Sequence, residues 1–356
     1  MKPKTPTLAS LATTFILALT PLAHAQQTAI TKPLGFVMVN IAAGTGSTKT
    51  GSLVSMPLQD VAAIAGQSTG RITGITANTI TNSDAGWTAG QLSTPASPYL
   101  IQITSGSANG RMFLISPAQA NTATTVTISP EDAETSSLTS LGIVTGPTTG
   151  DTYKIIPCDT LGSLLGTPAS SGVQGGTTPS AADTVILTTN GAARTYYFHT
   201  TLNRWTQVAL GNPDATNVPV RPYFGFRYER LANTPLAFLA SGSVPIVARA
   251  VPVRNAGSTV LSQYWPADST LATLGLHSLS NWTSNATAQS ADQVLITSNG
   301  TTQRFYHTGT EWKNAGTDAP ANAIPIPAGA SVHILQKGSD AGFTTLSQSV
   351  PYIGNL

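Results

Sequence analysis

A duplicated segment constrains the fold of this chain more than any other feature. Residues Asp183–Tyr197 read DTVILTTNGAARTYY, and residues Asp292–Tyr306 read DQVLITSNGTTQRFY, an ungapped match at an offset of 109 residues. Each copy places an Asn-Gly pair between two apolar runs, which is a strong local signal of a β-hairpin with a two-residue turn. The repeat therefore predicts two related β units of roughly 100 residues each.

The sequence around the duplicated hairpins indicates the rest of the fold. A Trp follows each copy (Trp205 and Trp312), and Thr, Ser and Gly dominate the chain while the helix formers Glu and Lys are scarce. Such a composition is typical of many short strands joined by turns. The predicted fold class is all-β: a small barrel-like unit followed by two related β-sandwich-like repeats, with a few short helices. The predicted division is a signal peptide at 1–25, an N-terminal β segment at 26–69, the barrel-like unit at 70–157, the first repeat at 158–253 and the second at 254–356.

The first 25 residues have the pattern of a secretory signal. Lys2 and Lys4 precede the apolar run Leu8–Leu22, and an A-x-A cleavage motif ends at Ala25. The run is too short and too rich in Thr for a membrane anchor, and no later segment is apolar enough to cross a membrane. We therefore expect cleavage after Ala25 and a mature protein in the periplasm, on the cell surface or outside the cell.

Loss of the signal changes the charge balance. The full chain has 17 Lys and Arg against 15 Asp and Glu, and cleavage removes Lys2 and Lys4, which leaves 15 of each sign. A near-neutral protein is a poor partner for nucleic acid, whose binding rests on phosphate neutralisation. Low net charge also favours self-association.

The residue types that usually carry chemistry are sparse and poorly spaced. The loop Ala43–Thr50 resembles a phosphate-binding loop but lacks the Gly that should precede Lys49. Glu131 and Asp132 fit the first turn of a helix that starts at Ser129 and ends at Gly142. The His residues beyond the signal show no metal-binding spacing; they are His199, His277, His307 and His333. The sequence thus predicts no catalytic residue, no metal and no cofactor.

The single cysteine, Cys158, rules out a disulfide scaffold. It follows a predicted strand, and no His lies near it in sequence to act as a base. We therefore expect a buried, unreactive thiol that packs as a small hydrophobic residue.

Four phrases carry a resemblance to a known family: RITGITANTIT with GWTAGQL, YLIQITSGSANGRMFLI, GDTYKIIPCDTLGSLLG and NRWTQV, within Arg71–Leu92, Tyr99–Ile115, Gly150–Gly166 and Asn203–Val208. Together they resemble an uncharacterised family of exported, β-rich bacterial proteins with no assigned activity, and the likeness covers most of the mature chain. The resemblance implies export and β structure and supplies no site residues. The middle phrases are also similar, more weakly, to small β-barrel modules of phage tail and surface-assembly proteins.

One strand, Arg221–Arg230, is chemically distinctive because it alternates aromatic and charged residues. With a period of two, Tyr223, Arg227 and Glu229 share a face opposite Phe224, Phe226, Tyr228 and Arg230. One interpretation is an ordinary core strand with Arg227 and Glu229 paired across strands. The other is an aromatic and Arg platform for a polyanionic glycan or a partner protein, formed by Tyr223, Arg227 and Trp205.

These observations predict an exported structural or adhesive protein without catalytic activity. Its expected partners are further copies of itself or other envelope proteins, and the uncharged C-terminal stretch Leu346–Ile353 is the expected edge for assembly. The alternative is a carbohydrate-binding protein that uses Tyr223, Arg227, Trp205 or the loop Trp residues. A hydrolase assembled from distant residues is a remote third hypothesis.

Overall fold

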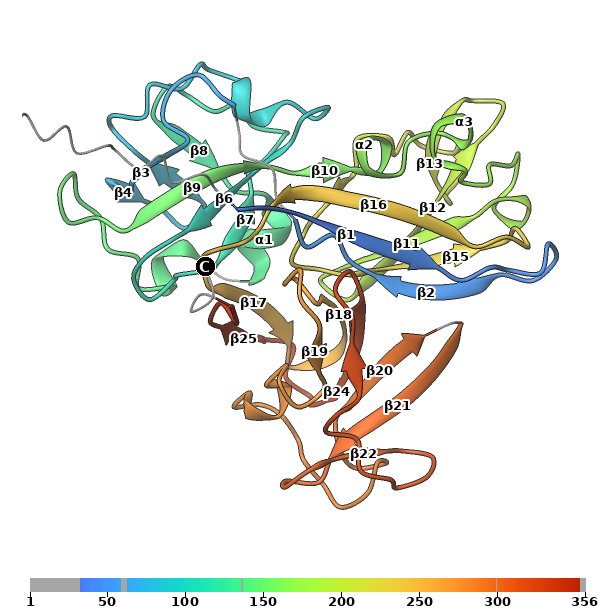
Figure 1. The fold of residues 1–356 in the computed structure, drawn as a ribbon. Coiled ribbons are helices and arrows are strands. Elements are labelled where there is room, and N and C mark those ends of the chain that lie inside the picture. The colour runs from blue at the N-terminus through green and yellow to red at the C-terminus, as the bar shows by residue number, and fades with distance from the viewer. Residues whose placement is uncertain (1–32, 59–62, 136, 299, 353–356) are drawn as a thin grey trace, which may run out of the picture. The chain divides into compact units, whose positions relative to one another are not determined.

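A computed structural model describes residues 33–58, 63–135, 137–298 and 300–352 of the chain (Figure 1). The expected signal peptide and its cleavage site lie outside these residues. The chain divides into Met1–Lys32 and Pro33–Leu356, and only the second unit is described below. Its structure is mostly strand, with short helices, which confirms the predicted all-β class.

The duplicated unit that contains Asp292–Tyr306, called the second copy, has two antiparallel layers. A five-stranded sheet of order β18-β24-β20-β21-β22 faces a two-stranded ribbon, β17–β25, and a short pair, β19–β23, lies beside them. The strands are β17 (Arg249–Arg254), β18 (Ala256–Ser262), β19 (Ser269–Thr270), β20 (Gln293–Ser298), β21 (Thr301–His307), β22 (Trp312–Asn314), β23 (Pro325–Ile326), β24 (Ser331–Lys337) and β25 (Phe343–Gln348).

The first copy repeats this arrangement strand for strand. Its sheet has the order β13-β12-β11-β15-β2, its ribbon is β1–β16 and its short pair is β10–β14. The strands and helices are β1 (Leu34–Ile41), β2 (Thr50–Val54), β10 (Asp159–Thr160), α2 (Leu161–Leu165), α3 (Pro168–Ser171), β11 (Thr184–Thr189), β12 (Ala192–His199), β13 (Arg204–Gln207), β14 (Pro219–Val220), β15 (Phe226–Arg230) and β16 (Leu236–Ser243). The first copy thus takes its first two strands from the predicted N-terminal segment, and the boundary predicted at residue 254 falls inside β17.

The remaining residues form an inserted unit within the first copy. Residues 55–158, 104 in number, separate β2 from β10, whereas the six residues 263–268 separate the matching strands of the second copy. The inserted unit has sheets of order β3-β9-β6-β7 and β4-β5-β8, and these do not close into a barrel in the part of the chain that is described. Its elements are β3 (Thr69–Arg71), β4 (Gly74–Ile75), β5 (Thr79–Thr81), β6 (Tyr99–Ile103), β7 (Met112–Leu114), β8 (Thr125–Thr127), α1 (Pro130–Thr135) and β9 (Thr152–Pro157).

The predicted hairpin turn of the first copy is confirmed. Thr189 pairs with Ala192, so Asn190 and Gly191 form a two-residue loop, and both have positive φ angles of 49° and 79°. This is the geometry that Asn-Gly favours. In the second copy Gly300 has a φ of 76°, while Asn299 lies outside the described residues.

The described residues form three apolar cores. One lies between the layers of the first copy and another inside the inserted unit. The core of the second copy extends to the outer face of the inserted unit's larger sheet, which contributes Leu100, Met112, Leu114 and Ile156. The inserted unit is therefore packed against its neighbours through apolar surface as well as polar contacts.

The two copies also contact each other reciprocally. The end of β2 pairs with the turn before β24, and the end of β18 pairs with the matching turn before β15. The bridged residues are Val54 with Ala330 and Leu261 with Phe224, and matching backbone hydrogen bonds run from Ser55 to Gly329 at 2.8 Å and from Ser262 to Tyr223 at 3.4 Å. Each copy offers the same two patches to the other, which is the pattern of an isologous dimer contained in one chain.

Candidate interaction surface

The predicted aromatic and Arg platform does not form on the surface. The rings of Tyr223 and Trp205 are buried, at 3% and 1% exposure, and belong to different cores. Tyr223 lies in a turn because β15 begins only at Phe226, and its hydroxyl contacts Asp132 at 3.4 Å. The Trp205 indole donates a hydrogen bond to the carbonyl of Gly166 at 2.8 Å. Only Arg227 is well exposed, so these three residues make no common face.

The alternation predicted for this strand is confirmed within β15. Phe226, Tyr228 and Arg230 are buried, whereas Arg227 is exposed. Arg227 forms an ion pair with Glu229 at 3.1 Å, and the two side chains follow one another along the same strand. The predicted pairing across strands was wrong because neighbours at i and i+2 on one face are already within reach of a long Arg side chain.

A buried charge cluster joins the first copy to the inserted unit. Arg221 pairs with Glu131 at 2.9 Å and with Asp132 at 3.6 Å, and a carboxylate oxygen of Asp132 accepts the backbone N–H of Leu114 at 2.6 Å. Burial alone would lower the pKa of Arg221, but the two carboxylates outweigh it and raise that pKa. Glu131 and Asp132 do open helix α1, as predicted, although the helix ends at Thr135. Because Arg221 of the first copy is held by two carboxylates of the inserted unit, the cluster acts as a structural clamp between them.

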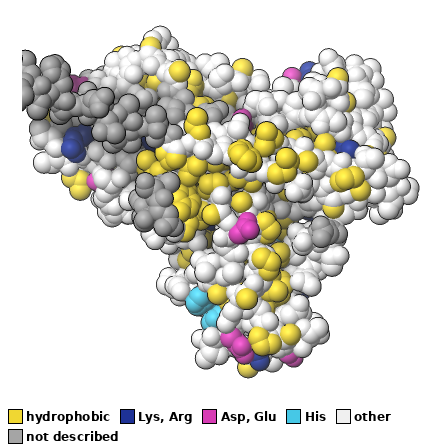
Figure 2. All heavy atoms as spheres, in the orientation of Figure 1, with side chains coloured by type: hydrophobic (Ala, Val, Ile, Leu, Met, Phe, Trp, Pro, Cys, Tyr) yellow, Lys and Arg dark blue, Asp and Glu magenta, His cyan; other side chains and the backbone are white. Residues whose placement is uncertain are grey.

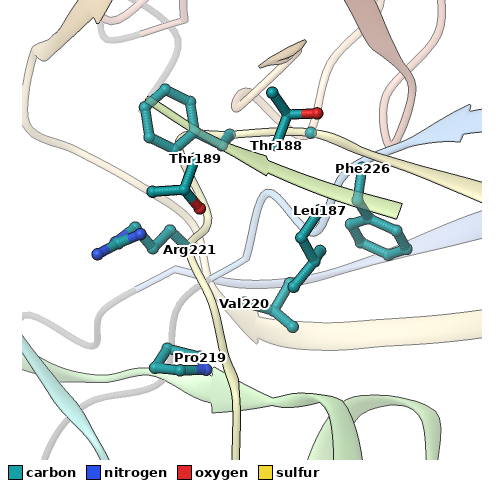
Figure 3. Close-up of a pocket in the computed structure, with 9 residues that line it drawn as sticks. Leu187, Thr188, Thr189, Pro219, Val220, Arg221 and Phe226 are labelled. Carbon is teal, nitrogen blue, oxygen red and sulfur yellow. The ribbon is translucent and has the colours of Figure 1, made fainter. Parts of the chain in front are cut away.

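Two cavities beside this clamp are modest in size. One of about 160 Å³ is lined by Glu131, Arg194 and Tyr196 among others. The other, of about 20 Å³, has room for about one water. Figure 3 shows that the Arg221 guanidinium points away from Leu187 and Phe226 there. Neither cavity offers a group of side chains suited to a defined reaction.

A buried aspartate opens the duplicated segment in both copies, and the sequence analysis did not single it out. Asp183 accepts hydrogen bonds from the backbone N–H groups of Gln174 and Leu231 at 2.9 and 2.8 Å, and it pairs with Arg230 at 2.6 Å. Asp292 accepts the matching backbone N–H groups, from Thr283 and Lys337, each at 2.8 Å. The signal that could have found them is their identity at the same position of the repeat.

Other residues that the sequence analysis considered have structural roles. Lys49 donates to the Pro179 carbonyl at 2.6 Å and to the Thr184 hydroxyl at 3.1 Å. His277 and His307 stack with ring centroids 4.5 Å apart. Cys158 is buried as predicted, and burial raises the pKa of its thiol to about 12. Across the described ranges, no three His, Cys, Asp or Glu side chains lie close enough to hold a metal ion.

A groove of about 600 Å³ lies between β1 and β2 of the first copy and the β20–β21 hairpin of the second. Its walls carry no charged side chain. Met38, Leu53 and Ile296 are among its apolar lining residues, and Asn40 is among the polar ones. Such a groove favours neutral, partly apolar material.

The most unusual surface is the outer face of the β1–β16 ribbon, which we call the ribbon face and define by Leu34, Phe36, Met38 and Leu239. These side chains are 79%, 76%, 52% and 63% exposed. They alternate with Val37, Val39 and Ile41, which point into the core. Figure 2 shows apolar side chains gathered along β1 and β16. Met38 also lines the groove, so the two surfaces are continuous.

The ribbon face lacks the usual protection against unwanted contacts. Neither strand contains a charged residue, with sequences LGFVMVNI and LAFLASGS. Among the described residues, β1 and β16 pair only with each other, so each keeps a free edge. Proteins normally protect such edges and faces with charge, proline or a covering element, and large exposed apolar patches mark interaction sites.

The matching ribbon of the second copy is covered. Ala250 of β17 donates its N–H to the carbonyl of Gly110 at 3.1 Å, and Arg111 donates to the Thr345 hydroxyl of β25 at 3.2 Å. Both partners belong to the inserted unit. Of the predicted C-terminal edge Leu346–Ile353, the part up to Gln348 belongs to β25, which pairs with β17 on one side and buries Leu346, while Ile353 lies outside the described residues. Its role in assembly stays a prediction.

No helix among the described residues is long and apolar enough to cross a membrane. A scan of protein-family models and a search of curated proteins each found no match to this chain. The resemblance to exported β-rich bacterial proteins therefore stays a prediction.

Proposed function

We propose that this protein is an exported structural or adhesive component of the cell envelope or the extracellular space, and that it works through contact surfaces and has no catalytic role. The ribbon face is the observation that carries the proposal. An uncharged strand pair with four large apolar side chains in water is costly for a protein that acts alone. It becomes favourable when a partner covers it, because buried apolar area stabilises a complex.

Two further features support this function. The mature chain is expected to be near-neutral, which weakens electrostatic repulsion between copies. The duplicated β units also provide a rigid scaffold on which a contact face keeps its shape. The carbohydrate-binding alternative is weaker, because Tyr223 and Trp205 are buried and do not offer their rings to a sugar.

The test is retention of the protein at the cell envelope. Tagged wild-type protein and the variant Phe36→Asp are expressed from the native signal, and their distribution between envelope and medium is measured. We expect the wild type to be retained and the variant to be lost to the medium. The variant Leu210→Asp is the control, because it places the same charge at a fully exposed Leu outside the ribbon face. Equal distribution of all three proteins would refute the proposal.

A further inference from the structure

We infer that the ribbon face binds the ribbon face of a second copy of this chain, as a twofold dimer. The inference rests on the proposed function and names the partner of its contact surface. It depends on three observations: the charge of the face, its area, and the way in which the matching face is covered in the second copy.

The charge pattern favours a like partner. A face that carries one sign of charge selects the opposite sign and repels itself, whereas the ribbon face carries none. Two such faces can therefore meet without bringing like charges together or burying an unpaired ion. In a twofold contact the same residues lie on both sides, so self-complementarity is the only requirement.

The area fits a reversible dimer. With ordinary side-chain sizes, the exposed fractions of the four residues amount to roughly 500 Å² of apolar surface, at the upper end for the largest patch of a monomer. Burial on both partners gives roughly 1,000 Å² in total, near the lower limit for a specific complex. We therefore expect a dimer that dissociates on dilution.

The second copy shows how such a ribbon is satisfied within the chain. Its matching outer positions hold small residues, among them Ala250, and the inserted unit covers them through Gly110 and Arg111. In the first copy the matching position is Phe36, which is exposed. The single inserted unit is already engaged, so it cannot cover both ribbons. Within the described residues, nothing plays for the ribbon face the part that the inserted unit plays for the β17–β25 ribbon.

Two experiments on the mature full-length protein test the inference. Sedimentation over a hundredfold range of micromolar concentrations measures the dissociation constant for wild type, Phe36→Asp and the control Leu210→Asp. We expect at least a tenfold increase for Phe36→Asp and no change for the control. Thermal unfolding checks that Phe36→Asp is folded, as expected because its ring points into solvent.

Cross-linking then locates the interface. Ser241 pairs with Phe36 across the ribbon and is exposed, and the only native thiol, Cys158, is buried. Under mild oxidation Ser241→Cys should form a disulfide-linked dimer. Thr310→Cys, at an exposed position of the second copy, should not.

The outcomes separate this inference from the proposed function. A wild-type monomer at all concentrations, with envelope retention still lost in Phe36→Asp, overturns the inference and leaves the proposed function standing with another partner, such as a lipid surface or a different protein. A dimer that persists in Phe36→Asp, or that cross-links only through Thr310→Cys, also overturns it. A wild-type monomer whose retention does not depend on Phe36 overturns both.

Discussion

At the scale of single residues, the two copies surround the same buried aspartate with different side chains. The buried carboxylates of Asp183 and Asp292 each tie an incoming loop to the C-terminal end of a neighbouring strand, β15 or β24. In the first copy Arg230 balances the charge, and Tyr228 donates a further hydrogen bond at 2.8 Å. In the second copy the position of Arg230 is taken by Gln336, whose buried side-chain amide has no hydrogen-bond partner among the described residues.

This difference predicts unequal costs for the same substitution. Asp183→Asn leaves the Arg230 cation buried without a counter-charge, and we expect a loss of about 3–5 kcal/mol in unfolding free energy. Asp292→Asn breaks only hydrogen bonds and should cost about 1–3 kcal/mol. Denaturant unfolding of both variants measures the two losses. A larger loss for Asp292→Asn would contradict this account.

Cys158 should be inert in the folded protein. Its thiol is buried, and burial raises its pKa to about 12, so almost no thiolate forms at pH 8. We expect a thiol reagent at pH 8 to modify the denatured protein within minutes and to leave the native protein unmodified over the same time. Fast labelling of native protein would show that the site opens.

At the scale of elements, the repeated hairpins depend on glycine at the second turn position. Gly191 and Gly300 have positive φ angles, and an added Cβ would approach Arg254 Nε within 2.9 Å at the first and the Thr50 side chain within 2.4 Å at the second. A residue with a Cβ is strained at these positive φ angles. The close side-chain contacts add local crowding to that strain.

We therefore expect Gly191→Val and Gly300→Val each to destabilise the protein by about 1–3 kcal/mol. Gly316→Ala is the control, because Gly316 has no positive φ and an added Cβ would lie 3.4 Å from its nearest neighbour, the side-chain oxygen of Asn314. Melting temperatures of the three variants decide the point. Unchanged melting of both valine variants would remove the turn geometry as a source of stability.

The elements also show which parts of the structure can be predicted from sequence. The hairpins and the start of α1 were predictable because each depends on residues close in sequence. The burial of Cys158 was predicted from its residue type and its place after a strand, although the core that buries it is built from distant residues. The membership of β1 and β2 in the first copy was not, because β2 pairs with β15, and Thr50 meets Arg230 far along the chain. The burial of Tyr223 was also missed, because a period of two was extended back beyond Phe226 into a turn.

At the scale of the whole molecule, acid should weaken the protein through the second copy. Burial, and then the neighbouring His277, lowers the pKa of His307, while burial and then Arg227 lower that of His333. A lowered folded pKa means that the unfolded chain takes up protons first as the pH falls below about 6.5. The stability that the two neutral histidines contribute is therefore fully present above that pH. It declines as the pH falls toward their pKa values in the folded protein.

We expect the melting temperature to fall between pH 7 and pH 5, and to fall less in the double variant His307→Asn and His333→Gln. These amides can replace the hydrogen bonds that the rings make with Gly309 and Ser258, but they do not titrate. An equal decline in the variant and the wild type would assign the acid sensitivity to other groups.

The position of the inserted unit also determines the order in which the parts of the chain can fold. The second copy and the inserted unit are each continuous in sequence, so each can fold soon after its last strand emerges. The first copy contains the earliest strand, β1, but it can complete its fold only after β16 is available. The two strands pair across a long stretch of sequence, for example Leu34 with Ser243. Pairings so distant in sequence form slowly, and until then the apolar strand β1 is open to other chains. While the chain folds, the strand that carries the ribbon face is thus the one most in need of a chaperone.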